Sequence, residues 1–277
     1  MSVCYLNGKF LDIKEAKISP LDRGFLFGDS IYEVIASYKK KPFKIDEHLD
    51  RLFINLKNIK LSINISRQEV KDIVEAVIEK NNLSNQIIYL QISRGADDIR
   101  NHIPSAKADP TVFISSFPLK DRPLKEINPI KVSLKKDFRW RKSNIKSTSL
   151  LANVMYKIQA QEEDFFEIIL QEDGFITEGA VSNIFYVKDN EVKTPSLENN
   201  ILPGVTRAVI INILKEMKIP IIETKISVED FMEADEIWIT NTTKGVLLVS
   251  EIDEIKLLDS NNIYQKVLNK FIEETLA

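Results

Sequence analysis

Two charged residues, Lys146 and Glu178, have chemical types and neighbours that could serve catalysis. Lys146 lies between Ile145 and Ser147, in a short polar stretch ahead of an apolar segment, and Glu178 directly precedes Gly179. A lysine amine can form a Schiff base with an aldehyde, and a carboxylate can keep a pyridine nitrogen protonated so that the ring withdraws electrons. These are two of the three anchors by which a protein holds pyridoxal phosphate. The third anchor is a phosphate site.

Each of the two residues also has an ordinary interpretation. Lysine is abundant in this chain, and most lysines in proteins are solvated surface charges. A glutamate beside a glycine is often an exposed turn residue. The functional interpretation requires Lys146 to be partly buried with a free amine for proton transfer, and Glu178 to be buried and ionised against a pyridinium N–H.

A phosphate site is predicted in the segment that contains Pro203 and Gly204. An apolar run follows these two residues, which is typical of a helix that begins there. The free amides of its first turn, those of Val205 and Thr206, would point toward an anion, and the helix dipole would assist them.

Further phosphate ligands are available elsewhere in the sequence. Residues 240–243 offer hydroxyl groups at the end of a predicted strand, and Arg51 on a predicted helix could bind a phosphate through two hydrogen bonds. The alternative for Arg51 is an ion pair with Glu47 on the helix surface.

Composition limits the classes of function. The chain has 277 residues, of which 44% are hydrophobic and 29% charged, as in an ordinary globular protein with room for two domains. The net charge of −3 comes without a block of basic residues, which argues against nucleic acid as a partner. We see no signal peptide and no membrane-spanning stretch, and the single cysteine, Cys4, excludes an intrachain disulfide framework. A cytoplasmic protein without a membrane partner is therefore expected.

Strand and helix patterns are mixed along the chain without a regular βαβ alternation, which favours an α+β fold in two domains. We expect an N-terminal domain over residues 1–118, a linker over 119–129 and a C-terminal domain over 130–277. Residues 118–129 combine prolines with charges and lack periodicity, which is typical of a linker.

Local signals predict several turns and helix starts. Hairpin turns are expected at Asn7-Gly8, Asp173-Gly174 and Asp189-Asn190. Asp46 is expected to cap one helix, and Ser66 with Glu69 forms the capping box of a second. Further helices are expected over about 149–162, after Gly204 and from about Ser260.

Five segments occur in an order that resembles one known family. They are residues 21–34, 47–52, 144–147, 177–179 and 202–207. In this order they are similar to the class IV, or fold type IV, pyridoxal-phosphate aminotransferases, and the likeness runs nearly from end to end. The resemblance implies a smaller N-terminal α/β domain and a larger C-terminal domain with a barrel-like sheet. It also implies pyridoxal phosphate as the cofactor, a homodimer, and no metal ion in the site.

The same resemblance implies roles for individual residues. Lys146 would be the Schiff-base lysine and the general acid and base, and Glu178 would pair with the pyridine nitrogen. The phosphate would be held by Arg51, Val205, Thr206 and Thr242.

Members of this family differ in how they hold the substrate carboxylate. The first segment, with Val34 where branched-chain enzymes usually have glycine, is most similar to the D-amino acid aminotransferases. In those enzymes an Arg-x-His pair and a tyrosine bind the α-carboxylate, and Arg100, His102 and Tyr32 match these positions. A guanidinium can bind a carboxylate through two parallel hydrogen bonds, with imidazole and phenol donors beside it. The alternative is that Arg100 and His102 are ordinary polar loop residues.

The resulting hypothesis is a homodimer that exchanges amino groups between D-amino acids, of the D-alanine or D-glutamate class, and 2-oxo acids such as 2-oxoglutarate or pyruvate. The loop with Arg100 and His102 would complete the active site of the other subunit. The alternatives are an L-branched-chain aminotransferase, an aminodeoxychorismate lyase and a non-catalytic member that uses the fold for binding. The presence of both Lys146 and Glu178 argues against the last.

Overall fold

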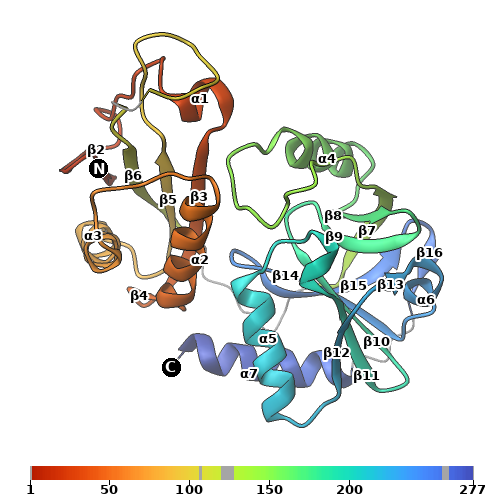
Figure 1. Ribbon diagram of the computed structural model, residues 1–277. Coiled ribbons are helices and arrows are strands. Elements are labelled where there is room, and N and C mark those ends of the chain that lie inside the picture. Colours follow the sequence, from red (N-terminus) through yellow and green to blue (C-terminus); the bar gives the residue numbers. More distant parts are fainter. Residues whose placement is uncertain (1, 106–107, 120–127, 258–261, 277) are drawn as a thin grey trace. The chain divides into compact units, whose positions relative to one another are not determined.

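The computed structural model describes residues 2–105, 108–119, 128–257 and 262–276. The chain divides into two compact units (Figure 1). The first unit comprises Met1–Asp121 and Ile145–Ser149, and the second comprises Arg122–Asn144 and Leu150–Ala277. Most of the linker expected over 119–129 lies outside the described residues.

The described strands of the first unit form a six-stranded sheet in the order β2-β1-β6-β5-β3-β4, and neighbouring strands in it are antiparallel. These strands are β1 (Val3–Leu6), β2 (Lys9–Asp12), β3 (Ser30–Tyr38), β4 (Lys41–Pro42), β5 (Gln86–Ser93) and β6 (Thr111–Pro118). Along most of β3 and β5, buried residues alternate with half-buried ones, so one face of the sheet is covered more completely than the other.

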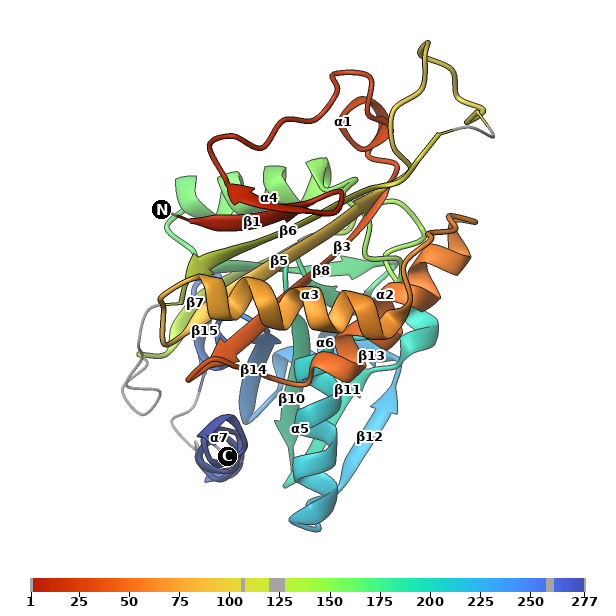
Figure 2. The ribbon, with the colours of Figure 1, turned by 90° about the vertical axis from the view of Figure 1, so that its left-hand side faces the viewer.

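Helices α2 (Ile45–Asn58) and α3 (Arg67–Lys80) lie over the covered face, in front of the sheet in Figure 2. Aliphatic side chains of both helices, among them Leu49, Leu52 and Val74, form one buried core with Ile35 and Ile88 of the sheet. The periodic apolar residues of each helix meet the apolar face of the strands, which explains why these segments fold together.

The two predicted helix caps of this unit have different outcomes. The capping box of α3 is confirmed, because Ser66 and Glu69 exchange both hydrogen bonds. The prediction that Asp46 caps α2 is wrong, because the N-cap is Lys44, two residues earlier, in a left-handed conformation (φ 53°). The Asp46 carboxylate is bound by Lys71 of α3 instead, so it is not free to cap the backbone.

The described strands of the second unit form a mixed sheet of ten, in the order β12-β11-β10-β14-β15-β7-β8-β9-β13, with β16 paired to β15. The strands are β7 (Ile130–Lys136), β8 (Glu167–Glu172), β9 (Phe175–Gly179), β10 (Asn183–Lys188), β11 (Glu191–Pro195), β12 (Ile221–Thr224), β13 (Ile226–Ser227), β14 (Glu236–Asn241), β15 (Gly245–Ile252) and β16 (Ile255–Lys256). Strands β9 and β13, at one end of this strand order, contact β10 and β11 near the other end. The sheet therefore curls back on itself, as expected for the predicted barrel-like sheet.

Four helices in the described part of the chain contact this curled sheet: α4 (Leu151–Glu162), α5 (Val205–Glu216), α6 (Val228–Met232) and α7 (Asn262–Leu276). A 3-10 turn, η1 (Leu197–Asn199), lies between β11 and α5 in the chain. Helix α5 contacts α7 and β14, and α4 contacts β8. Helix α4 begins at Leu151, slightly after the predicted start, because residues 146–148 pair with β3 in the first unit. Within the described ranges, no helix is long and apolar enough to cross a membrane.

The three predicted hairpin turns are confirmed. Asn7-Gly8 joins β1 to β2, Asp173-Gly174 joins β8 to β9, and Asp189-Asn190 joins β10 to β11. All six residues have positive φ, between 45° and 90°. Asn, Asp and Gly tolerate this backbone conformation best, which is why these three turns could be predicted from their residue types.

Candidate active site

Lys146 lies against Tyr32 at the start of β3, within the first unit. Its Nζ is 3.3 Å from the Tyr32 hydroxyl oxygen and 4.3 Å from the ring centroid. The backbone sets this contact, because the Tyr32 N–H donates to the Lys146 carbonyl and Ser147 forms a β-bridge with Ile31. Lys146 is half-buried, as the functional interpretation requires.

Arg51 is held by Glu33, which lies on the covered face of β3. Arg51 donates from Nε and Nη2 to the two carboxylate oxygens of Glu33, each over 2.7 Å, and His48 Nδ1 lies 2.8 Å from Oε2. Burial by itself raises the pKa of Glu33, but the charge and hydrogen bonds of Arg51 and the hydrogen bond of His48 lower it to about 2. Arg51 is therefore a buried, oriented cation and not the helix-surface residue considered as an alternative.

Arg100 and His102 lie in the loop between β5 and β6, and both side chains contact Phe27. The guanidinium carbon of Arg100 is 4.6 Å from the Phe27 ring centroid, and the two aromatic ring centroids of His102 and Phe27 are 5.3 Å apart. Both residues are exposed. Among the described residues, Arg100 forms no ion pair, and neither side chain has a hydrogen bond or ring contact with Tyr32.

Glu178 lies in the second unit, one residue before the end of β9, and is only 4% exposed. Its interpretation as an exposed turn residue is therefore wrong. Three groups donate to the carboxylate: Arg139 Nη1 over 2.6 Å, Leu202 N over 3.1 Å and Asn183 Nδ2 over 3.2 Å. A carboxylate has about four acceptor positions, so one further donor, such as a pyridinium N–H, can be bound.

Arg139 supplies the positive charge beside Glu178. Asp137 fixes the guanidinium, because it accepts from Nε over 3.0 Å and from Nη2 over 2.7 Å and leaves Nη1 for Glu178. Burial raises the pKa of Glu178, while the charge and hydrogen bond of Arg139 and the Leu202 N–H oppose that rise. Since a guanidinium stays protonated, this contact favours an ionised Glu178 in a place that would otherwise favour the neutral acid.

Leu202 connects Glu178 to the N-terminus of α5. Its N–H donates to Glu178, and its carbonyl accepts from Asn183 Nδ2 over 2.9 Å. Helix α5 begins at Val205, and its N-cap residue, Gly204, has no side chain that could bind the first-turn amides. A Cβ at Gly204 would lie 2.0 Å from Asn183 Oδ1, so a larger residue there would have to displace the Asn183 side chain.

The residues of the second unit fit a pyridine ring that carries a phosphate. Glu178 offers a buried carboxylate for a ring N–H, and the uncapped α5 offers amides and the positive end of its dipole for an anion. Val205 and Thr206 in the first turn of α5 are both buried. Thr242 lies in the turn after β14, whose Thr240 is paired with Asn183 of β10.

Comparison with known proteins identifies one family for this chain. Residues 30–252 match the family model described as Amino-transferase class IV. The chain belongs to this family. The D-alanine aminotransferase of Staphylococcus haemolyticus is 35% identical over 281 residues, which cover 99% of each protein. That of Listeria monocytogenes serotype 4b is 33% identical over 97% of this chain and 94% of its own.

Among solved structures, the branched-chain amino acid aminotransferase of Escherichia coli superposes on this class IV aminotransferase with a TM-score of 0.88. The two are 25% identical, and the match covers 98% of this chain and 93% of that one. The predicted α+β, two-domain fold type IV architecture is therefore confirmed.

For this class IV aminotransferase, the sequence predictions assigned no partner to Glu178 within the protein. Arg139, Asp137 and Asn183 surround it in the structure. The functional interpretation of Glu178 as a buried, ionised carboxylate could have pointed to an arginine partner, because such a carboxylate needs a cation or several donors to remain charged. The sequence does not distinguish Arg139 from Arg141, whose side chain is 82% exposed.

Proposed function

We propose that this chain is a pyridoxal-phosphate-dependent aminotransferase that exchanges amino groups between D-amino acids and 2-oxo acids. D-Alanine and D-glutamate are the proposed donor class, and pyruvate and 2-oxoglutarate are the proposed acceptors. The geometric observation that carries the reaction type is the Glu178 carboxylate, buried among three donors and tied through Leu202 to the uncapped start of α5. Similarity to D-alanine aminotransferases over nearly the whole chain supports the substrate class.

Bound pyridoxal phosphate supplies an aldehyde that captures the amino group and a protonated ring that stabilises negative charge at the substrate Cα. Lys146 is the proposed covalent attachment point of the cofactor and moves the proton from the substrate Cα. Tyr32, with its hydroxyl 3.3 Å from Lys146 Nζ, restricts the positions that the amine can take. Glu178 holds the ring nitrogen in its protonated form.

The proposed phosphate ligands are Arg51 and the turn of Thr242, together with the amides of Val205 and Thr206. Glu33 and His48 orient Arg51 beforehand, so less side-chain entropy is lost when an anion binds. A buried guanidinium and the end of a helix dipole are both suited to a phosphate dianion.

The proposed grip on the substrate carboxylate consists of Arg100, His102 and Tyr32. Arg100 supports this role, because its guanidinium lies on the Phe27 ring and has no ion pair within the described residues. If the carboxylate is held on a fixed side of the cofactor, that geometry decides whether the D or the L enantiomer directs its single Cα hydrogen toward Lys146. The residues that bind the substrate carboxylate therefore determine whether D or L donors react.

We also propose that the chain forms a homodimer. Helix α4 carries four apolar residues with the i, i+3, i+4, i+7 spacing of one helix face: Leu151, Val154, Met155 and Ile158, which are 75%, 50%, 51% and 51% exposed. An uncovered apolar stripe of this kind is typical of a protein–protein interface.

A two-donor transamination assay tests the function. Purified protein with pyridoxal phosphate, D-alanine and 2-oxoglutarate should form pyruvate, whereas L-leucine should be a poor donor. Activity with L-leucine and none with D-alanine would identify an L-branched-chain enzyme, the activity named for the Escherichia coli relative. Release of pyruvate from aminodeoxychorismate without an amino acceptor would identify a lyase. Protein that stays colourless with pyridoxal phosphate would point to a non-catalytic member.

A further inference from the structure

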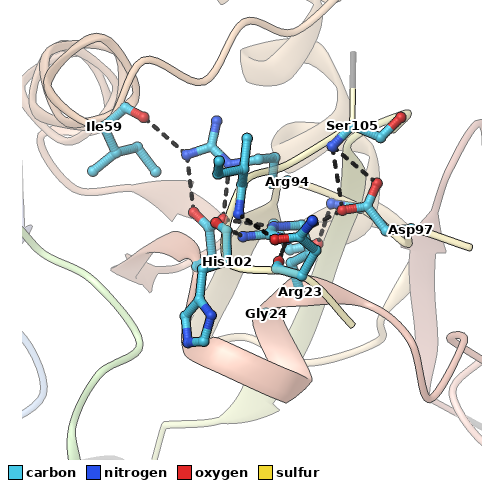
Figure 3. A network of polar contacts seen from close by, with 12 residues as sticks. Arg23, Gly24, Ile59, Arg94, Asp97, His102 and Ser105 are labelled. Atoms are coloured by element: carbon cyan, nitrogen blue, oxygen red, sulfur yellow. Dashed lines mark hydrogen bonds and ion pairs between the residues drawn. The ribbon is translucent and has the colours of Figure 1, made fainter. Parts of the chain in front are cut away.

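Arg23, the first residue of the short helix α1 (Arg23–Phe27), is buried beneath the loop that carries Arg100 and His102. Its guanidinium donates from Nη1 to the Asn101 carbonyl over 2.5 Å and from Nη2 to the His102 carbonyl over 2.9 Å. The side chain is only 4% exposed. In Figure 3 the carbonyl of His102 faces this guanidinium, whereas the imidazole points away from the network.

The same guanidinium is held by two carboxylates. Its Nε lies 3.0 Å from Asp29 Oδ2, and its Nη1 lies 3.1 Å from Asp97 Oδ2. Asp97 also accepts from the Ser105 N–H over 3.2 Å, which ties the far side of the loop to the same point. Arg23 therefore binds the backbone directly after Arg100 and the side chain of Asp97, three residues before it.

A second arginine, Arg94, provides a contrast within the same network. It pairs with Asp29 through two hydrogen bonds, of 2.8 and 2.9 Å. Its other hydrogen bonds go to the carbonyls of Ile59 and Lys60, the two residues that follow α2, and not to the loop. Arg23 and Arg94 thus share a carboxylate and differ in what they anchor.

Phe27 links the anchor to the functional side chains. Its ring centroid is 4.7 Å from the guanidinium carbon of Arg23, 4.6 Å from that of Arg100 and 5.3 Å from the ring centroid of His102. Cations are attracted to the face of such a ring, and a second ring packs favourably against it in a tilted arrangement. The ring therefore supports the side chains of Arg100 and His102 while Arg23 holds their backbone.

We propose that Arg23 is a positioning residue for substrate specificity. It holds the loop so that Arg100 and His102 are oriented to bind the carboxylate of the amino donor. This inference rests on the proposed function, in which Arg100 and His102 bind the substrate carboxylate. Arg23 touches neither the substrate nor the cofactor in this role. It acts through the carbonyls of Asn101 and His102 and through the ring of Phe27.

The experiment compares Arg23→Met with Arg94→Met, since each change removes one guanidinium from Asp29. Each variant, loaded with pyridoxal phosphate, is assayed with D-alanine and with ethylamine, which is D-alanine without its carboxylate. The loss of an oriented, charge-assisted contact should raise the D-alanine KM of Arg23→Met by about tenfold or more, while kcat changes less and the ethylamine rate is unchanged. Arg94→Met should leave the ratio of D-alanine to ethylamine rates unchanged.

Amide hydrogen exchange supplies a readout that does not depend on activity. Exchange of the amides of residues 99–103 should be faster in Arg23→Met than in Arg94→Met, and Arg23→Lys should recover part of both effects because it keeps the charge. Equal effects of the two Met variants, or parallel losses with D-alanine and ethylamine, would overturn the inference. If Arg23→Met does not fold, the same comparison is made with Arg23→Lys and Arg94→Lys.

A third variant, Arg100→Ala, separates this inference from the proposed function. If Arg100→Ala leaves the D-alanine to ethylamine ratio unchanged, the assigned carboxylate grip is wrong, and the inference fails with it. If Arg100→Ala lowers that ratio and Arg23→Met does not, only the role of Arg23 is refuted.

Discussion

Arg139 donates from Nη1 to Glu178 Oε1 over 2.6 Å, and both side chains are more than nine-tenths buried. Because a buried carboxylate without a cation tends to take up a proton, this contact favours the charged form of Glu178. A charged Glu178 is needed to keep the pyridine nitrogen of the cofactor protonated. The ion pair between Arg139 and Glu178 therefore supports the proposed role of Glu178 toward the cofactor.

Removal of Arg139 should destabilise the protein and weaken cofactor binding. Arg139→Met leaves Glu178 and Asp137 buried without their cation, and the loss of one member of a buried ion pair costs about 3–5 kcal/mol. Arg141→Met is the matched control, because Arg141 is 82% exposed and pairs with Glu172 at the surface, where such pairs contribute about 0–1 kcal/mol. Urea unfolding and titration with pyridoxal phosphate measure both effects. Similar losses in the two variants would contradict this account.

Lys146→Ala should abolish transamination without unfolding the chain. The side chain is half-buried, and the β-bridge beside it is formed by the backbone, so the fold does not depend on the amine. Loss of a general acid and base lowers a rate by about 10²–10⁴-fold, and loss of the covalent attachment point adds to this. Steady-state rates with D-alanine, circular dichroism and the visible absorbance of the loaded protein test the prediction. Substantial remaining turnover would mean that another lysine serves the reaction.

Glu33 should make the stability of the protein sensitive to acid. Its pKa in the folded protein is about 2 against an ordinary 4.5, so the unfolded chain binds the proton first as the pH falls. The stabilisation is present above pH 4.5 and is lost as the pH falls toward 2. It amounts to roughly 3 kcal/mol, because one pKa unit corresponds to about 1.4 kcal/mol.

His48 acts in the same direction. Burial lowers its pKa from 6.5, against the raising effect of Glu33, so below pH 6.5 the unfolded chain binds a proton more readily than the folded protein. Free energies of unfolding measured from pH 7 to 3 should fall less steeply for Glu33→Gln than for the unmodified chain. The exposed Glu47→Gln on α2 is the control and should keep the original slope. Parallel curves for Glu33→Gln and the unmodified chain would refute the assignment.

Gly95 should tolerate alanine far less well than Gly8, although both have φ near 90°. A Cβ at Gly95 would lie 1.8 Å from the carbonyl oxygen of Asp109, whereas a Cβ at Gly8 would meet nothing within 4 Å. Gly8→Ala should therefore cost only the backbone strain, about 1–2 kcal/mol, and Gly95→Ala should cost more because the backbone must move. Chemical denaturation measures the two losses, and equal values would contradict the role of crowding.

A charge within the apolar stripe of α4 should weaken the proposed homodimer. Met155→Lys places an ammonium group among Leu151, Val154 and Ile158, where its desolvation in an interface is unfavourable. Gln161→Lys, at an exposed polar position of the same helix, is the control. Sedimentation velocity should show monomer for Met155→Lys and dimer for the control. A dimer that persists in Met155→Lys would place the interface elsewhere.

Local signals in the sequence were reliable where neighbouring residues decide the outcome. The capping box of Ser66 and Glu69 depends on residues three positions apart, and the start of α5 depends on Pro203 and Gly204 just before it. The failure at Asp46 has the opposite cause, because a side chain on α3 binds the carboxylate. Long-range pairing therefore overrode a local preference.

The sequence by itself determined the chemical types of the site residues, their order along the chain and the three hairpin turns at Asn7-Gly8, Asp173-Gly174 and Asp189-Asn190. It did not determine which charges pair, because partners such as Glu178 and Arg139, or Glu33 and Arg51, lie far apart in sequence. The packing of the helices and sheets decides such contacts, and burial then decides their pKa. Tertiary structure alone made Glu178 a buried acceptor beside Arg139, and placed Arg23 beneath the loop that carries Arg100 and His102.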